Sequence, residues 1–251
     1  MRLKGKTALV TGASVGIGAA IARRFAEEGC PVYLVGGRNR RALEDTLAAC
    51  RKAGAQAAGE CADLADLKAL EGIFGRALGF LKQIGILVNC AGARSHKPAQ
   101  DFTLEEVETL FRVNAMAAFL LSGLAARHML ERGGGQILNI GSTAGEAGVP
   151  SNSLYCATKG AMHLMAKAQA AELGPKGIRV NVLAPGTTLS EGTVKRVEED
   201  AERARKLLET VPLNRFATPE EIAACAAFMA SEEASYMNGA VVLVDGGRLC
   251  L

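Results

Sequence analysis

Tyr155 and Lys159 have the residue types and the spacing that proton transfer requires. On a helix, residues four apart lie on one face, one turn from each other. A free tyrosine has a pKa near about 10 and is a poor acid or base at neutral pH, but a nearby ammonium favours the phenolate. We therefore expect this pair to exchange a proton with an alcohol or carbonyl oxygen.

The same spacing also occurs by chance on ordinary helix surfaces, so the pair is interpreted together with its neighbours. Ser142 lies 13 residues before Tyr155, at the end of an apolar strand predicted over 136–140. Asn114 lies among the apolar residues of a helix predicted over 114–130. Because a buried amide must be hydrogen-bonded, Asn114 is expected to be either a structural bracket or part of a polar relay.

A glycine-rich turn opens the chain between a short apolar strand, 7–10, and a helix on which Ile17, Ile21 and Phe25 recur every four residues. This order points backbone N–H groups and the positive end of a helix at one spot, which suits a phosphate. The spacing is G-x-x-x-G-x-G rather than the G-x-G-x-x-G of the usual dinucleotide fingerprint. The glycines are alternatively explained by tight strand–helix packing, but phosphate binding is the favoured interpretation.

The end of the second predicted strand indicates which dinucleotide binds. An NAD site usually has a carboxylate here, which accepts from the ribose 2′-hydroxyl. This chain has Gly37, followed by Arg38. A guanidinium binds a 2′-phosphate that a carboxylate would repel, so the pattern predicts NADP(H). The alternative is that Arg38, Arg40 and Arg41 only solvate the first turn of the next helix.

Strands and helices alternate along the whole chain, which predicts one α/β domain over 1–251 with a doubly wound parallel sheet of about seven strands and helices on both faces. A charged segment within 187–210 has few apolar residues and is expected to form a mobile flap over the site. The predicted strands are 7–10, 32–35, 55–61, 86–89, 136–140, 178–183 and 240–244.

The residue totals argue against several classes of function. The 251 residues carry a net charge of +3, from 29 basic and 26 acidic residues, which is too balanced to imply nucleic acid or an anionic membrane surface. No apolar run reaches the roughly 18 residues that span a bilayer. Seven scattered cysteines and no apolar leader segment predict a cytoplasmic protein with reduced thiols, and three histidines without clustered ligands predict no metal site.

Taken together, these motifs resemble the short-chain dehydrogenase/reductase family over essentially the whole chain. The resemblance implies a Rossmann fold, a nicotinamide cofactor and, usually, a homotetramer. The family pattern is not matched at Cys90, Gly141 and Ser190, where a second Asn, a Ser and a Thr are common. The matching motifs are Thr11-Gly12-x-x-x-Gly16-Ile17-Gly18, Asp63, Asn89-x-Ala91-Gly92, Asn114, Ser142, Tyr155-x-x-x-Lys159, Pro185-Gly186 and Val244-Asp245-Gly246-Gly247.

The resemblance also implies a role for each residue of the site. Tyr155 is the general acid in reduction, Ser142 bonds the substrate carbonyl, and Lys159 favours the phenolate and holds the nicotinamide ribose. Asn114 positions a water that relays protons to Lys159. Besides Tyr155 and Lys159, cofactor contacts are expected at Gly12, Ser14, Gly16, Ile17, Gly18, Arg38, Asp63, Leu64, Asn89, Ala91, Gly92, Pro185, Gly186, Thr188 and Ser190. From the residues alone, Asp63 is equally an adenine acceptor or the cap of a helix starting near Asp66.

The sequence therefore predicts an NADP(H)-dependent oxidoreductase that interconverts a ketone and a secondary alcohol. Within the family it most resembles 3-oxoacyl-carrier-protein reductases. The alternative is an NAD(H)-dependent alcohol, sugar or polyol dehydrogenase, and a different class is a non-catalytic NADPH-sensing protein. Polar residues in the loops near the strand ends make a hydroxyl- or carboxylate-bearing substrate as plausible as an acyl chain. They are Arg94, His96, Glu146 and Asn152.

Two helices, 114–130 and 153–173, carry more apolar and small residues than one sheet face covers. Surplus apolar helix surface indicates a subunit interface, so we expect a homotetramer with these helices paired across a two-fold axis. The residues on which this expectation depends are Ala115, Ala117, Ala118, Leu121, Ala161, Met162, Leu164, Met165 and Ala168.

Overall fold

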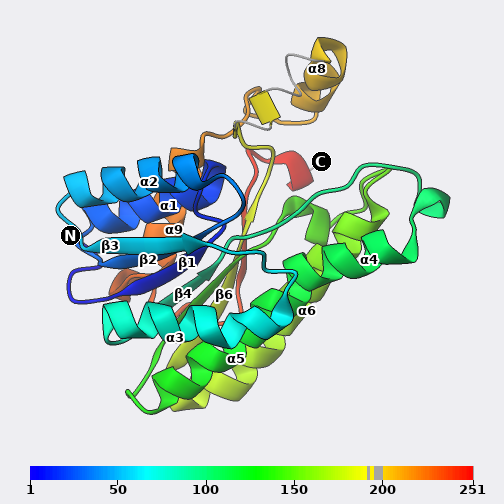
Figure 1. The fold of residues 1–251 in the computed structure, drawn as a ribbon. Helices are drawn as coiled ribbons and strands as arrows, with labels where there is room; N and C mark the ends of the chain where they lie inside the picture. Colours follow the sequence, from blue (N-terminus) through cyan, green and yellow to red (C-terminus); the bar gives the residue numbers. More distant parts are fainter. Residues whose placement is uncertain (191–192, 195–199, 251) are drawn as a thin grey trace.

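The computed structural model describes residues 1–190, 193–194 and 200–250 and contains a seven-stranded parallel sheet between two layers of helices (Figure 1). The strand order is β3-β2-β1-β4-β5-β6-β7, so the winding direction reverses between β1 and β4. This confirms the predicted single-domain, doubly wound Rossmann fold. The strands are β1 (Ala8–Thr11), β2 (Val32–Gly36), β3 (Ala57–Cys61), β4 (Ile86–Asn89), β5 (Gly135–Ile140), β6 (Ile178–Pro185) and β7 (Val241–Val244).

Both faces of the sheet are buried at β1, β2 and β4, which explains why these strands read as apolar runs. Successive side chains on a strand point to opposite faces. On β1, Ala8 and Val10 therefore belong to one apolar cluster and Leu9 to the other. The sequence must supply apolar residues at every position of such a strand rather than at every second one.

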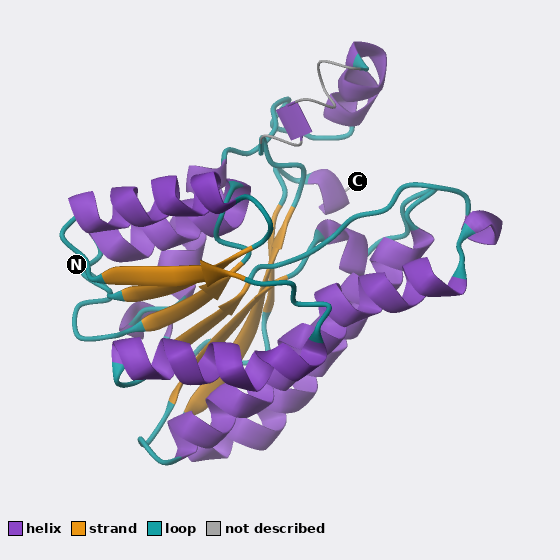
Figure 2. Ribbon diagram, in the orientation of Figure 1, coloured by secondary structure: helices purple, strands orange, loops and turns teal. Residues whose placement is uncertain are grey.

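The first apolar cluster is covered by α1 (Gly16–Glu27), α2 (Arg40–Lys52) and α9 (Pro219–Met229). The second is covered by α3 (Leu70–Leu81), α5 (Ala117–Leu130) and α6 (Ser153–Leu173). Figure 2 shows the two helical layers on either side of the strands. Helix α9, near the end of the chain, packs along α1, which follows the glycine-rich turn.

The helix predicted over 114–130 is the later part of a longer helix that begins at Leu104. The segment α4 (Leu104–Phe111) continues through a π-helical turn (Arg112–Met116) into α5. The helix begins with a capping box, in which Thr103 and Glu106 bond each other's backbone N–H. This 27-residue helical segment, Leu104–Leu130, is long and apolar enough to cross a membrane by length and composition alone. In the fold it packs against β4, β5, α3 and α6.

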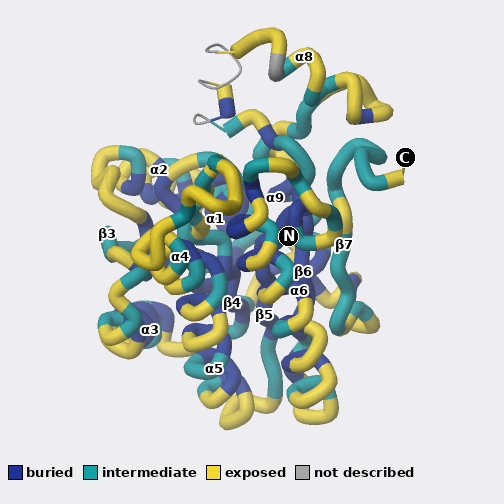
Figure 3. The backbone as a smooth tube through the Cα atoms, turned by 90° about the vertical axis from the view of Figure 1, so that its right-hand side faces the viewer, coloured by how far each residue is buried: buried dark blue, intermediate teal, exposed yellow. Residues whose placement is uncertain are grey.

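The helix α8 (Ala201–Glu209) stands away from the body of the protein (Figures 1 and 3). It lies within the predicted flap, of which residues 191–192 and 195–199 are outside the described part of the chain. Two ion pairs at i,i+4 spacing run along it, Glu202 with Lys206 and Arg205 with Glu209. These pairs support the helix where packing does not.

The expected surplus of apolar surface on α5 and α6 is partly wrong. Four of the named residues, Ala117, Ala118, Leu121 and Met162, are buried inside their own chain. Of the named residues, Leu164 is exposed, at 71%, and the outward faces also carry Phe119, at 55% exposure, which was not named. An apolar composition does not tell how a helix is rotated about its axis, so the sequence identified the helices but not all of the exposed positions.

Candidate active site

The predicted site residues gather at the carboxyl ends of β1, β4, β5 and β6, on either side of the point where the winding reverses. Ligands of open α/β sheets bind at such a point. Thr11 ties two of these ends together, since its Oγ1 accepts from the backbone N–H of Cys90 at 3.0 Å and of Ala91 at 3.1 Å. The glycine turn after β1 thus lies directly beside the loop after β4.

Two glycines of the turn are required by close approach. Gly12 has φ +68°, and a Cβ there would lie 2.7 Å from the Ala91 backbone. A Cβ on Gly18 would overlap the carbonyl oxygen of Gly12. Helix α1 starts at Gly16 without a side-chain cap, so its first N–H groups face the turn without such a partner. This uncapped helix start behind a glycine-rich turn fits a dinucleotide phosphate.

The end of β2 is open and basic. Arg38 is 97% exposed, and its Nη2 lies 4.0 Å from the carboxylate of Asp63. Nothing lies within 4 Å of the position that a Cβ on Gly37 would occupy. Asp63 accepts from the N–H of Ala65, whereas Asp66 caps the following helical turn, so the capping alternative for Asp63 is wrong. Leu64, next to Asp63, is buried.

Tyr155 and Lys159 lie on one face of α6, at 8% and 3% exposure. The ammonium of Lys159 donates to the carbonyl of Ile140, the last residue of β5, at 2.8 Å. It lies 5.9 Å from the centre of the Tyr155 ring. Ser142 follows β5 by two residues, and its Oγ accepts from the N–H of Ala144 at 3.1 Å. Among the described residues Oγ of Ser142 only accepts, which leaves its hydroxyl proton available to donate to a substrate.

Asn114 lies fully buried in the π-helical turn. Its Oδ1 accepts from the N–H of Ala93 at 2.7 Å, and its Nδ2 donates to the carbonyl of Ala93 and to Oγ1 of Thr158. The side chain of Asn114 therefore ties the loop after β4 to helix α6 by hydrogen bonds. A π-helical turn at such a position is a recurrent feature of functional sites.

Asn89 points away from the turn. Its Nδ2 donates to Ser122 on α5 at 3.1 Å and to Oδ1 of Asn139 on β5 at 2.9 Å. A cofactor contact at this position is left to the backbone. At the next residue, burial raises the pKa of the Cys90 thiol to about 12, although the charge of Lys159 acts to lower it. The raised pKa keeps this thiol protonated at neutral pH.

The loop after β6 returns to the glycine turn. Thr188 is buried and donates to the carbonyl of Gly186, and it pairs with Ala217 in an isolated β-bridge. A Cβ on Gly16 would lie 3.1 Å from Cβ of Ser190. Pro185 and Gly186 at the end of β6 thus carry the 187–190 segment back to the start of α1.

Of the four polar loop residues, Arg94 lies over the ring of Tyr155. Its guanidinium lies 4.8 Å from the centre of the Tyr155 ring. Asn152 donates to the carbonyl of Pro150. Glu146 instead contacts His163, at 2.6 Å. The sequence analysis missed His163, although its spacing of four residues from Lys159 placed it on the face of α6 that carries Tyr155.

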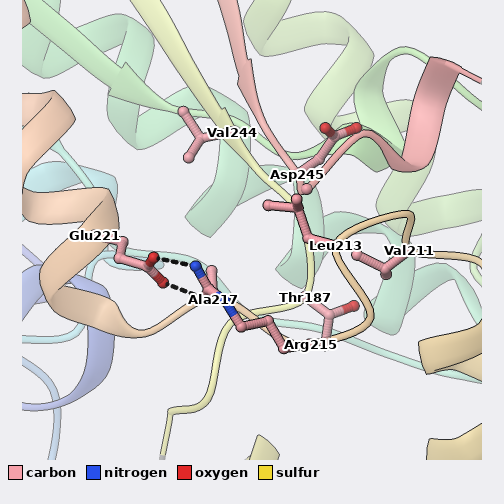
Figure 4. A pocket seen from close by; sticks show the side chains of 9 residues that line it. Thr187, Val211, Leu213, Arg215, Ala217, Glu221, Val244 and Asp245 are labelled. Atoms are coloured by element: carbon pink, nitrogen blue, oxygen red, sulfur yellow. Dashed lines mark hydrogen bonds and ion pairs between the residues drawn. The ribbon is translucent and has the colours of Figure 1, made fainter.

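Two cavities lie apart from this constellation. A small one of about 80 Å³ lies at the base of the flap, where Arg215 pairs with both carboxylate oxygens of Glu221 (Figure 4). A wider one of about 710 Å³ is lined by Gly85, Gln136 and Arg179, which lie at the amino end of the sheet. In the described part of the chain, no three His, Cys, Asp or Glu side chains come together as a metal site.

The comparisons with known proteins agree with this geometry. The family profile described as enoyl-(acyl carrier protein) reductase matches residues 12–248. D-threitol dehydrogenase of Mycolicibacterium smegmatis is 38% identical over 248 residues, covering 98% of this chain and 94% of the relative. The chain therefore belongs to the short-chain dehydrogenase/reductase family, and it is an oxidoreductase of the kind that acts on CH–OH and C=O groups.

Two solved structures have the same fold. One, from Beutenbergia cavernae, is assigned as an NAD(P)-dependent gluconate 5-dehydrogenase with NADP bound at low occupancy. It has a TM-score of 0.93 and 35% identity, covering 99% of this chain and 98% of its own. The other is a 7α-hydroxysteroid dehydrogenase complexed with NADH and 7-oxo glycochenodeoxycholic acid. Its TM-score is 0.92 and its identity 34%, and the match covers 98% of this chain and 95% of the steroid dehydrogenase chain. Proteins similar to this chain thus bind either nicotinamide dinucleotide.

Proposed function

We propose that this chain interconverts a secondary alcohol and a ketone on a polyol or sugar-derived substrate, using NADP(H). The proposal is carried by one arrangement: Tyr155 and Lys159 share a face of α6 beside the end of β5, which delivers Ser142. A sensor would need only the dinucleotide cradle. The buried ammonium held against the end of β5 favours the enzyme.

A bound nicotinamide supplies or accepts the hydride. In the reductive direction, Tyr155 donates its proton to the carbonyl oxygen while the hydroxyl of Ser142 donates a hydrogen bond to that oxygen. Lys159 stabilises the phenolate that results. Asn114 holds the loop after β4 against α6 through its bonds to Ala93 and Thr158. It is proposed to order the water that returns a proton to Lys159.

The preference for NADP(H) is supported by the end of β2. Gly37 offers no carboxylate for a ribose 2′-hydroxyl, and the exposed Arg38 offers a planar pair of donors for a 2′-phosphate. Its ion pair with Asp63 is long and solvent-exposed, so displacing it costs little. The remaining cofactor contacts are proposed along the same edge of the sheet. They are the glycine turn, Asp63, and the loops 89–92 and 185–190.

The polyol or sugar substrate is supported in two ways. The names of similar proteins are those of threitol and gluconate dehydrogenases, which favours this alternative over the expected 3-oxoacyl-carrier-protein reductase. It is also supported by Arg94, whose guanidinium lies 4.8 Å from the centre of the Tyr155 ring, so that a substrate bound at Tyr155 would have a cation nearby. Hydroxyl and carboxylate oxygens are suitable acceptors for it.

A substrate panel tests the proposal. D-threitol and D-gluconate are assayed with NADP⁺ and with NAD⁺, and an acetoacetyl thioester with NADPH and with NADH, each by absorbance of the reduced nicotinamide. We expect NADP⁺ to be reduced by a polyol or a sugar acid, and NADPH to be oxidised only slowly by the thioester. A thioester that reacts fastest contradicts the substrate class, and NADPH binding without any turnover favours the sensor.

The assembly and the flap belong to the same proposal. We propose a cytoplasmic homotetramer in which the outward faces of α5 and α6 meet a second copy, supported by exposed Phe119 and Leu164. The segment 187–210 is proposed as a flap that closes over the substrate, supported by the way α8 stands off the body of the protein (Figure 3).

A further inference from the structure

His163 is a buried, ionisable residue beside the proposed catalytic site that the mechanism above does not use. It lies one helical turn after Lys159, on the same face of α6, and its side chain is only 4% exposed. Both ring nitrogens have partners from the turn after β5. Nε2 lies 3.4 Å from the backbone N of Ser142, and Nδ1 lies 2.6 Å from Oε1 of Glu146.

These partners fix the protonation of the ring. The backbone N–H of Ser142 can only donate, so Nε2 must be the unprotonated acceptor. The Glu146 carboxylate accepts, so Nδ1 carries the proton. The neutral imidazole in this tautomer thus joins both ends of the 142–146 turn.

The backbone closes around the ring. A Cβ on Gly141 would overlap Nε2, and a Cβ on Gly145 would lie 2.5 Å from Cε1. The ring therefore occupies the space that a serine at position 141, common in the family, would need. The turn Thr143–Gly145 is in addition held by the N–H of Ala144 donating to Oγ of Ser142. A shift of the imidazole consequently moves the Ser142 backbone.

We infer that His163, oriented by Glu146, is a positioning residue that holds Ser142 in its reactive place. The inference rests on the proposed function, in which the Ser142 hydroxyl bonds the substrate oxygen. Hydrogen-bond donors at such a place act only within narrow geometry, and a displacement of about 1 Å costs on the order of 100-fold in rate.

The surroundings of the ring keep it neutral. Burial lowers the pKa of His163, and the charges of Lys159 and Lys167 on α6 act in the same direction, whereas the hydrogen bond and charge of Glu146 raise it. Protonation would place an N–H at Nε2 against the N–H of Ser142. Activity should therefore be lost as the pH falls through the pKa of His163, which lies below that of a free histidine.

Variants at two histidines separate positioning from folding. His163→Leu removes the acceptor, while His163→Gln keeps an amide oxygen near the place of Nε2. His128 is the matched control, because its Nε2 also accepts a backbone N–H, that of Ile84 at 3.2 Å, in the turn before β4 and away from the site. Turnover of the fastest substrate in the panel, NADPH affinity and melting temperature are measured for each variant and for Ser142→Ala.

We expect His163→Leu to lose about 10- to 100-fold in kcat while its affinity for NADPH is kept. His163→Gln should recover most of the lost kcat. His128→Leu should lose stability but keep its kcat. If Ser142→Ala is impaired while His163→Leu is not, or if Gln rescues nothing, positioning is overturned. If Ser142→Ala retains full turnover, the proposed function fails first.

Glu146→Gln provides a second readout. The carboxamide oxygen still accepts from Nδ1, so turnover at alkaline pH should be kept, but the lost negative charge moves the acid limb of kcat/KM to lower pH. In ¹⁵N spectra at neutral pH, a signal absent from His163→Gln should show Nδ1 protonated and Nε2 bare. An unmoved acid limb, or a proton on Nε2, overturns the inference, and the spectra need neither substrate nor the leucine variant.

Discussion

At the scale of single residues, the central prediction concerns the oxygen of Tyr155. Tyr155→Phe keeps the ring packed in its buried place and removes only the ionisable group. We expect turnover to fall by at least about 100-fold with NADPH binding retained, since general acid catalysis contributes about 10²–10⁴-fold. Ser142→Ala should lower turnover at unchanged cofactor affinity, whereas Lys159→Ala should lower both. Steady-state kinetics with fluorescence titration of NADPH measure this, and a Phe variant above about a tenth of wild-type turnover contradicts the role of Tyr155.

The second residue-scale prediction concerns the dinucleotide. Gly37→Asp with Arg38→Leu replaces a donor by an acceptor at the end of β2, so NADPH should bind at least about 10-fold more weakly and NADH more tightly, as expected for one charged hydrogen bond. Arg41→Leu is the matched control for lost charge. Equal affinities of the wild type for both dinucleotides contradict the proposal.

Single residues were predictable where a motif has fixed spacing. Tyr155, Lys159 and Ser142 meet at the end of β5 because a helix repeats every few residues and a strand delivers its end at one edge. The inward direction of Asn89 was not predictable, since it depends on Ser122 and Asn139, which are distant in sequence. His163 was missed for the same reason: its partner Glu146 belongs to another element.

At the scale of elements, the π-helical turn holds Asn114, for which the sequence left two interpretations open: a structural bracket or part of a polar relay. The stability of an Asn114 variant distinguishes the two. Asn114→Ala removes three hydrogen bonds, two of them to Ala93, and leaves the Ala93 peptide unpaired. We expect the free energy of unfolding to fall by about 1–3 kcal/mol in addition to any loss of activity.

Thr158→Val is the control for this variant, because it removes one of those bonds and spares the Ala93 peptide. Denaturant unfolding of both proteins makes the comparison. An Asn114→Ala protein as stable as the wild type would show that the side chain serves the relay alone.

The strands and the capped helix starts were predictable because apolar runs and Thr-x-x-Glu patterns are local signals. The junction of α4 and α5 was not. A π-helical turn changes the backbone at Arg112–Met116 without a residue pattern of its own, so the sequence predicted a helix start at Asn114, inside a continuous helix.

At the scale of the whole molecule, assembly is the main prediction. Phe119→Glu and Leu164→Glu place charges on the outward faces of α5 and α6, where burial against a second copy would make them costly. We expect light scattering to show a tetramer for the wild type and smaller species for both variants. Leu104→Glu, at an exposed leucine on α4, should leave the mass unchanged. A monomeric wild type at micromolar concentration contradicts the proposal.

The packing of α9 along α1 has a consequence for how the protein is made. Residues Ile21, Ala22 and Phe25 on α1 are fully or almost fully shielded from solvent, in the same cluster as Ile222 and Ala226 on α9. Helix α1, which is proposed to bind the dinucleotide, emerges early from a ribosome, whereas α9, which covers it, is among the last segments to emerge. A chain ending at Ala217 contains the complete glycine turn but leaves that apolar face in water, so we expect it to be digested rapidly by protease and to bind NADPH at least about 10-fold more weakly than the full chain. A fragment that titrates NADPH like the full chain would show that residues 1–217 fold independently of α9 and β7; otherwise the nascent protein needs protection until its final strand has been synthesised.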